Sequence, residues 1–161
     1  TVTHTPRDVK FERGDDEASG ERARRAVSVL VREAQFRVEV TSAFRGRRAM
    51  CGVGLGLTEA AHVYPASAPD SPDVLGNGLL LCPSHHAAFD RHLVWVDAVD
   101  SRRRMHPTLE AVRERPDADG RFVTGTYERL LHVDDRSDDV RADMLRRRCD
   151  RYRDQYGWLA K

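Results

Sequence analysis

Three consecutive segments decide the fold of the central part of the chain: EAAHVYP (59–65), ASAPDSPDVLG (66–76) and NGLLLCPSHHAAFD (77–90). The first is apolar and ends at a proline, which is typical of a short strand. The second is rich in turn-forming residues and has no periodicity, so it predicts a surface loop. The third begins apolar, and its Pro-Ser step predicts a helix with Ser84 as the N-cap.

Two polar side chains stand at the ends of these apolar runs. His62 follows two alanines at the end of the first strand, where a neutral imidazole is suited to act as a general base toward water. A satisfied core histidine is the alternative for His62. Asn77 lies beside two glycines, and it either adopts a left-handed turn, holds the loop, orients the base or ligates a metal ion.

The helix that follows carries a histidine pair and an aspartate. His86 and Asp90 are four residues apart and share one face, so they form one edge of a metal site. His85 points about 100° away from that face and is kept as a further candidate ligand. A capped surface helix is the alternative. Together with His62, this pattern favours metal-assisted hydrolysis, with nucleic acid as the expected substrate.

The three cysteines, Cys51, Cys82 and Cys149, form no disulfide framework, and we expect a reducing, intracellular (cytoplasmic) setting. Cys82 and His85 have a C-x2-H spacing that Cys51 could join. A structural zinc site would need a fourth ligand, so the sequence favours Cys51 and Cys82 as small buried residues instead.

Composition adds little about the partner. The 161 residues predict one domain, placed at 21–161, with its motif core at 49–97 and a polar arm over residues 1–20. The net charge is +1, and nearly all basic residues are arginines, whose planar forks suit phosphate. No apolar run is long enough to span a membrane. The candidate phosphate-binding residues are Arg45, Arg47, Arg48 and Arg91.

Periodicity predicts an α+β fold around this core. A helix begins at Glu21 and carries two apolar lines, Ala23/Val27/Leu30/Ala34/Val38 and Phe36/Val40/Phe44, with Gly46 as its stop signal. We expect a β-hairpin over residues 92–106, a strand at 121–124 and a last helix at 140–156. The terminal YGW is expected to pack back on the core.

The motif EAAHVYP…NGLLLCPSHHAAFD resembles that of the HNH nuclease family. The flanking segments REAQFRVEVTSAFRGRRAMCGVGL, HLVWVD and LRRRCDRYRDQYGW resemble the family's preceding helix and turn, its following strand and its final helix. The resemblance is close over residues 30–100 and looser beyond. It implies a ββα-metal core that binds one divalent ion, Mg²⁺, Mn²⁺, Ni²⁺ or Zn²⁺. It makes His62 the general base, Asn77 the central asparagine, and His86 rather than His85 the last motif histidine.

By the same resemblance, the chain is expected to be a metal-dependent DNA endonuclease, the cleavage domain of a restriction or anti-phage defence protein. A recognition or sensor domain outside this chain would choose the site, and double-strand cleavage would imply a homodimer. One departure matters: many members have a metal-ligating residue before the base, where this chain has Ala61, so Glu59 or water would have to substitute. A non-catalytic nucleic-acid-binding module and a nuclease toxin are the alternatives, and the choice between DNA and RNA stays open.

Overall fold

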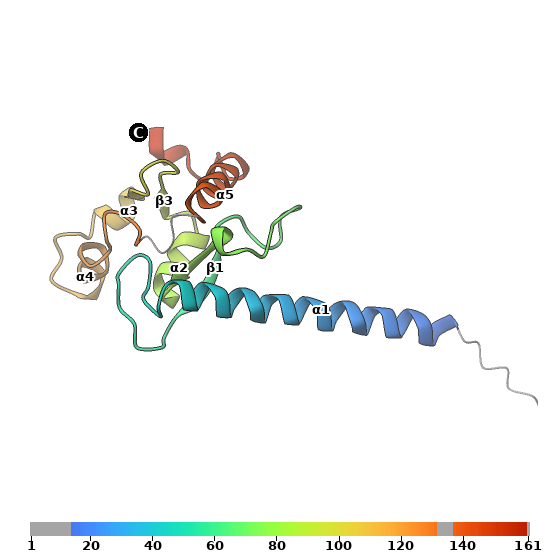
Figure 1. The fold of residues 1–161 in the computed structure, drawn as a ribbon. Coiled ribbons are helices and arrows are strands. Elements are labelled where there is room, and N and C mark those ends of the chain that lie inside the picture. Colours follow the sequence, from blue (N-terminus) through green and yellow to red (C-terminus); the bar gives the residue numbers. More distant parts are fainter. Residues whose placement is uncertain (1–13, 132–136, 161) are drawn as a thin grey trace, which may run out of the picture.

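The computed structural model describes residues 14–131 and 137–160. One long helix, α1 (Gly14–Ala43), projects from a compact body of short strands and helices (Figure 1). The helix begins seven residues before the expected Glu21, so the predicted helix start was too late. The rest of the predicted polar arm, residues 1–13, lies outside the described residues.

Only one of the two apolar lines of α1 meets the body. Phe36, Val40 and Phe44 are almost completely buried. The other line is exposed to solvent, for example at Leu30 and Val38. The chain leaves the helix through a tight turn in which Gly46 has a φ of +67°, as the stop signal predicted.

The centre of the body is a two-stranded antiparallel hairpin with a helix packed against it. Strand β1 (Glu59–His62) pairs with β2 (Gly78–Leu81), and His62 lies opposite Gly78. A Cβ at Gly78 would lie 2.3 Å from Val40 and 3.2 Å from the Phe36 ring, so only glycine lets α1 pack this closely on the strand.

Helix α2 (Pro83–Asp90) follows β2 directly, with Pro83 in its first turn. The N-cap is Cys82, whose sulfur accepts a hydrogen bond from the backbone N–H of His85. The prediction of Ser84 as N-cap was therefore wrong by two residues, because the proline already stands inside the helix.

The remaining elements surround this unit. Strands β3 (Val94–Val96) and β4 (Arg103–Met105) form the predicted antiparallel hairpin. The expected strand at 121–124 is instead part of a helix, because Asp117 accepts hydrogen bonds from two backbone N–H groups and caps it. The other elements are η1 (Leu75–Asn77), α3 (Pro107–Glu110), α4 (Ala118–Thr124), α5 (Asp138–Arg151) and η3 (Gly157–Ala160).

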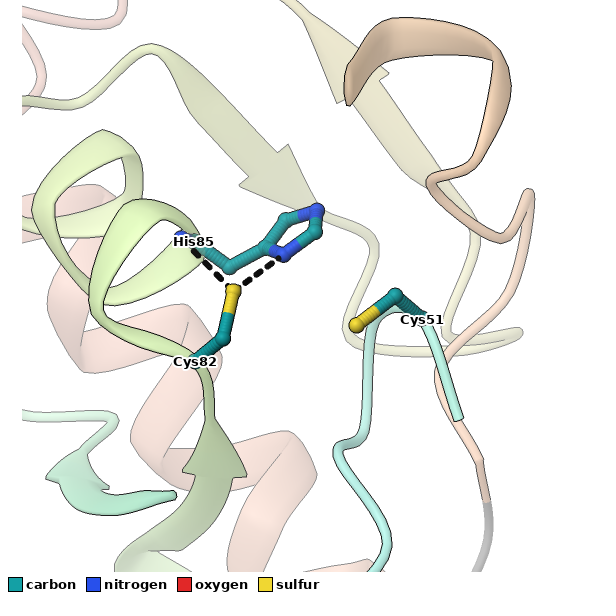
Figure 2. Close-up of side chains that lie close together, drawn as sticks. All are labelled: Cys51, Cys82 and His85. Atoms are coloured by element: carbon teal, nitrogen blue, oxygen red, sulfur yellow. Dashed lines mark hydrogen bonds between the residues drawn. The ribbon is translucent and has the colours of Figure 1, made fainter. Parts of the chain in front are cut away.

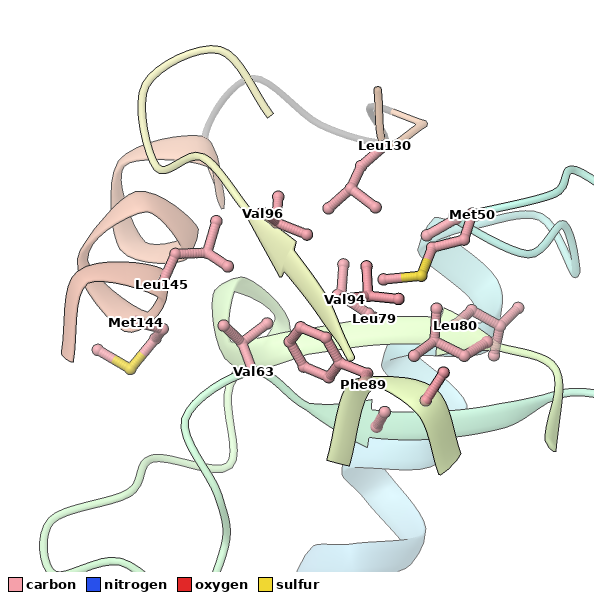
Figure 3. Close-up of a cluster of buried hydrophobic side chains, with 14 of the residues drawn as sticks. Met50, Val63, Leu79, Leu80, Phe89, Val94, Val96, Leu130, Met144 and Leu145 are labelled. Carbon is pink, nitrogen blue, oxygen red and sulfur yellow. The ribbon is translucent and has the colours of Figure 1, made fainter. Parts of the chain in front are cut away.

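The hydrophobic core lies where these elements meet (Figure 3). Every residue of β2 is buried, and Phe89 of α2 is completely enclosed. The labelled side chains come from the hairpins, α2, α5 and the segments after α1 and α4: Met50, Val63, Leu79, Leu80, Phe89, Val94, Val96, Leu130, Met144 and Leu145. The fold is α+β, as predicted. Among the described residues, no helix is long and apolar enough to cross a membrane.

A buried arginine joins the last helix to this core. The Arg148 guanidinium donates hydrogen bonds to the backbone oxygens of Val63 (3.0 Å) and Phe89 (2.6 Å) and to the Tyr156 hydroxyl (2.9 Å). Tyr156 is itself buried, and Trp158 donates to the His92 carbonyl. The C-terminal YGW therefore packs back on the core, as expected.

Candidate active site

Two neighbouring side chains hold His62 at the end of β1. Its ring stacks on Phe36 of α1, with centroids 4.0 Å apart and planes inclined by 14°. Its Nε2 lies 3.0 Å from a carboxylate oxygen of Asp73 in the loop between the strands. The imidazole is thus anchored but retains a partly exposed edge.

The Asp73 contact settles which nitrogen of His62 is available for chemistry. An ionised carboxylate only accepts hydrogen bonds, so Nε2 must carry the hydrogen and Nδ1 the lone pair. Such a pairing both fixes the ring and favours the imidazolium that forms after proton uptake. Asp73 was missed by the sequence reasoning, because it lies in an aperiodic loop that gives no signal of its partner. Phe36 was recognised only as an apolar helix residue.

Asn77 is completely buried and organises the loop between the strands. Its Oδ1 accepts from the Tyr64 backbone N–H at 2.7 Å, and its amide donates to the backbone oxygens of Tyr64 (3.1 Å) and Pro72 (2.9 Å) and to the Ser71 hydroxyl (3.2 Å). Of the roles weighed from sequence, these contacts support the one that holds the loop. The same loop carries Asp73, so Asn77 acts on His62 through it.

His86 lies between two carboxylates on the exposed face of α2. Its Nδ1 is 2.6 Å from Glu59 and its Nε2 is 3.3 Å from Asp90, one helical turn further on. His62, His86 and Asp90 line one surface hollow together with small residues: Ala60, Pro65, Ala66 and Ser67. The structure therefore brings the predicted base and the predicted metal edge together across β1 and α2.

These side chains are suited to hold a divalent ion. One imidazole and two carboxylates provide nitrogen and oxygen donors, which borderline and hard divalent ions accept. The three ligand atoms are not yet gathered around one point, since Glu59 and Asp90 contact opposite nitrogens of His86. The residue before His62 is Ala61, whose methyl side chain has no ligand atom and is buried in the core. This position, where many family members have a metal ligand, therefore contributes nothing to metal binding here.

His85 occupies a different environment from its neighbour. It is buried, stacks on Phe122, and contacts the Cys82 sulfur through Nδ1 and the Thr126 hydroxyl through Nε2. Burial, with smaller contributions from Arg48 and Arg103, lowers the pKa of His85 from 6.5 to about 4. The structure thus separates the two histidines, and His85 does not join His86 at the hollow.

The candidate phosphate-binding arginines lie outside the set of residues that line the hollow. Arg45 and Arg47 are exposed in the turn after α1, and Arg91 is exposed at the end of α2. Arg48 donates to the Leu57 carbonyl at 2.9 Å and so supports the loop. None of these four is among the described residues that line the hollow.

A two-stranded antiparallel hairpin followed by a helix, with a histidine at the end of the first strand and a second histidine on the helix, defines a ββα-type nuclease core. Residues 44–97 match the sequence profile of the HNH endonuclease family. The match covers about a third of the chain, and over these residues the chain is similar to an HNH endonuclease domain, a class of phosphodiester hydrolase.

The fold also resembles a solved structure, that of a modification-dependent TagI restriction endonuclease. The two share 22% sequence identity with a TM-score of 0.52, and the match covers 73% of this chain and 37% of the other. The chain thus spans little more than a third of that protein's length. Among curated proteins, no significant match was found.

Proposed function

We propose that this chain is the cleavage domain of a metal-dependent DNA endonuclease of a restriction or anti-phage defence system. The observation that carries the proposal is the shared hollow, where the anchored base His62 faces the His86–Asp90 edge. The profile match and the restriction endonuclease neighbour support a nuclease. The DNA substrate, the defence role and a cytoplasmic location are inferred.

His62 would remove the proton from the attacking water at Nδ1, while Asp73 keeps the hydrogen at Nε2 and stabilises the charged ring. His86 and Asp90 would hold the divalent ion, with Glu59 as the carboxylate that compensates for Ala61. A bound ion supplies positive charge against the developing charge of the phosphate and the leaving oxygen. Mg²⁺, Mn²⁺, Ni²⁺ and Zn²⁺ all fit this donor set.

The scissile strand would approach from the exposed side of α2 and the turn after α1. Arg91 at the end of α2, and Arg45 and Arg47 in the turn, are exposed and available to phosphates. Selection of the target site belongs to a domain outside residues 44–97. This division agrees with the small share of the modification-dependent neighbour that the present chain covers.

A second copy would place two such sites on one duplex. The exposed apolar residues Val27, Val31, Ala34 and Val38 of α1 are spaced by four, three and four residues, which is the seam of a two-helix coiled coil. At about 100° per residue, this seam lies opposite the face that carries Phe36 and Val40. Two copies of the chain could therefore pair through this seam of α1 while the opposite face of each helix stays packed on its own body. We propose a homodimer of this kind.

One observation favours the alternative of a non-catalytic nucleic-acid-binding module. Ala61 contributes no donor where many family members have a metal ligand, and it is buried. A module that had lost this ligand would keep the fold but bind DNA without cutting it. The two functions differ in a single measurable property, metal-dependent strand cleavage.

The test is nicking of supercoiled plasmid with Mg²⁺, Mn²⁺, Ni²⁺ or a chelator. We expect metal-dependent nicking by the parent and a loss of about 10²- to 10⁴-fold in His62→Ala. His106→Ala, which changes a histidine at the start of α3, serves as the matched control and should cleave like the parent. Equal cleavage by parent and His62→Ala would overturn the assigned base. DNA binding without any nicking would favour the non-catalytic module.

A further inference from the structure

Cys51, Cys82 and His85 lie close together beside the start of α2 (Figure 2). Cys82 caps α2, His85 stands in its first turn, and Cys51 approaches from the turn after α1. One ligand atom from each residue lies within 4.8 Å of the others. Among the residues that the structure describes, this is the one group of three potential ligands gathered so closely.

Hydrogen bonds fix the tautomer of His85 so that it faces the thiols with a lone pair. The Thr126 hydroxyl donates to the Phe122 carbonyl at 2.7 Å, so its oxygen accepts from Nε2–H of His85 at 2.8 Å. Nδ1 is then unprotonated and lies 3.0 Å from the Cys82 sulfur. A histidine that donates from one nitrogen and offers the other is the usual form of a metal-bound imidazole.

The position of Cys82 also suits a metal-bound thiolate. Its sulfur lies at the N-terminus of α2 and accepts the backbone N–H of His85 at 3.4 Å. In the metal-free protein the Cys82 S–H faces the lone pair of Nδ1, and an ion that displaces this proton would leave a sulfur whose negative charge the helix dipole favours. Two thiolates and a neutral imidazole balance the charge of one divalent ion. They are also the donor types that zinc prefers.

Backbone hydrogen bonds of the neighbouring residues fix the position of Cys51. The neighbouring Ala49 N–H donates to the Leu80 carbonyl of β2 at 2.7 Å, and the Met50 carbonyl accepts from the Tyr127 N–H at 2.7 Å. Gly52 follows with a φ of +67°, and a Cβ there would collide with the Tyr127 ring. The site is therefore largely formed before any ion binds.

We propose that Cys51, Cys82 and His85 bind one Zn²⁺ ion that is distinct from the catalytic metal. Cys51 is only half-buried, so the fourth position opens toward solvent and is filled by water. Binding releases the two thiol protons and ties the turn after α1 to the start of α2. Because α2 also carries His86, the ion stabilises the helix that the active site depends on.

Binding of Co²⁺ to the metal-free protein tests the site directly, since thiolate ligands give a charge-transfer absorption that carboxylates do not. We expect one equivalent of Co²⁺ with this absorption in the parent. It should be lost in Cys51→Ser and Cys82→Ser and retained in Cys149→Ser and His86→Ala. No thiolate absorption in the parent, or its retention in the Cys51→Ser/Cys82→Ser double variant, would overturn the proposal.

Two further measurements do not depend on whether the cysteine variants fold. Zn²⁺ should protect Cys51 and Cys82 of the parent from alkylation, as read by mass spectrometry, and leave Cys149 as reactive as in the metal-free protein. Thr126→Val removes the acceptor for Nε2–H of His85, together with the hydroxyl donor to the Phe122 carbonyl, and leaves all three proposed ligands in place. It should weaken Co²⁺ binding by about 10- to 100-fold. Unprotected thiols with excess Zn²⁺, or a Cys51–Cys82 disulfide in protein purified under reducing conditions, would exclude the site. Both readouts are independent of cleavage, so the zinc site and the proposed nuclease can fail separately.

Discussion

The His62 imidazole lies flat on the Phe36 ring, with centroids 4.0 Å apart, and this contact joins the long helix to the candidate active site. The contact exists because His62 pairs with Gly78 across the hairpin, and the absence of a side chain at Gly78 admits Phe36 and Val40. The packing of α1 against the hairpin therefore also fixes the orientation of His62, the proposed base.

We expect Phe36→Leu to lower kcat of nicking several-fold with little change in KM, because the base keeps its position but loses the surface that fixes its plane. Phe44→Leu is the matched control, since Phe44 continues the same buried line just past the end of α1 and lies eight residues, about two turns, beyond Phe36. Each substitution should destabilise the fold by about 1 kcal/mol. Equal kcat losses in both variants would show that the effect is general destabilisation.

Asp73 should act as a positioning residue for His62. Asp73→Asn retains an oxygen that accepts from Nε2–H, whereas Asp73→Ala removes the acceptor. We therefore expect the alanine variant to lose a larger part of the ~10²- to 10⁴-fold contribution of the base than the asparagine variant. The measurement is single-turnover nicking at saturating metal. Identical rates for Asp73→Ala and the parent would refute this role.

Asn77→Ala should destabilise the protein strongly, by about 2–4 kcal/mol, because it removes the side-chain partner of the Tyr64 N–H and of the Pro72 carbonyl. Ser71→Ala removes only one of the four contacts of Asn77 and should cost much less. Urea unfolding of the three proteins compares their free energies of unfolding. A small effect of Asn77→Ala would mean that the loop is held mainly by other contacts.

His85 should make the metal-free protein sensitive to acid. Its pKa is about 4 in the folded protein and near 6.5 when exposed, so the unfolded chain binds more protons between these values. The free energy of unfolding should therefore fall by about 3 kcal/mol from this group as the pH drops from 6.5 to 4. Urea unfolding in chelator across this range tests it. In His85→Gln this part of the pH dependence should vanish. If the free energies of unfolding of the parent and of His85→Gln fall in parallel as the pH drops, the prediction is contradicted.

The exposed seam of α1 should control the oligomeric state. We expect the parent to be a dimer by sedimentation, and Val31→Glu/Val38→Glu to be a monomer, because charges in a coiled-coil seam oppose association. Val29→Glu is the matched control, since Val29 is exposed on the opposite side of the helix. A monomeric parent, or a dimer that persists in the double variant, would count against association through this seam.

The sequence by itself determined the order of the central elements and the identity of the motif. The apolar runs at 59–65 and 77–82, the Pro83 start signal and the i, i+4 spacing of His86 and Asp90 are local properties. Local spacing therefore predicted the first strand, the helix and the edge that His86 offers, whereas the two-stranded core was implied by the family resemblance. The alternating residues 93–96 predicted the second hairpin for the same reason.

Tertiary structure decided what lies against each of these residues. The partners of His62 come from α1 and from an aperiodic loop, and the distant partners of His85 are Phe122 of α4 and Thr126. Neither helical nor strand periodicity in the sequence relates positions that are so far apart along the chain. The same limit explains the helix found at 118–124, where an aspartate cap outweighed a short apolar run that is ambiguous between strand and helix. It also explains why adjacent histidines differ: about 100° of helical rotation sends His86 to the hollow and His85 into the core beside two thiols.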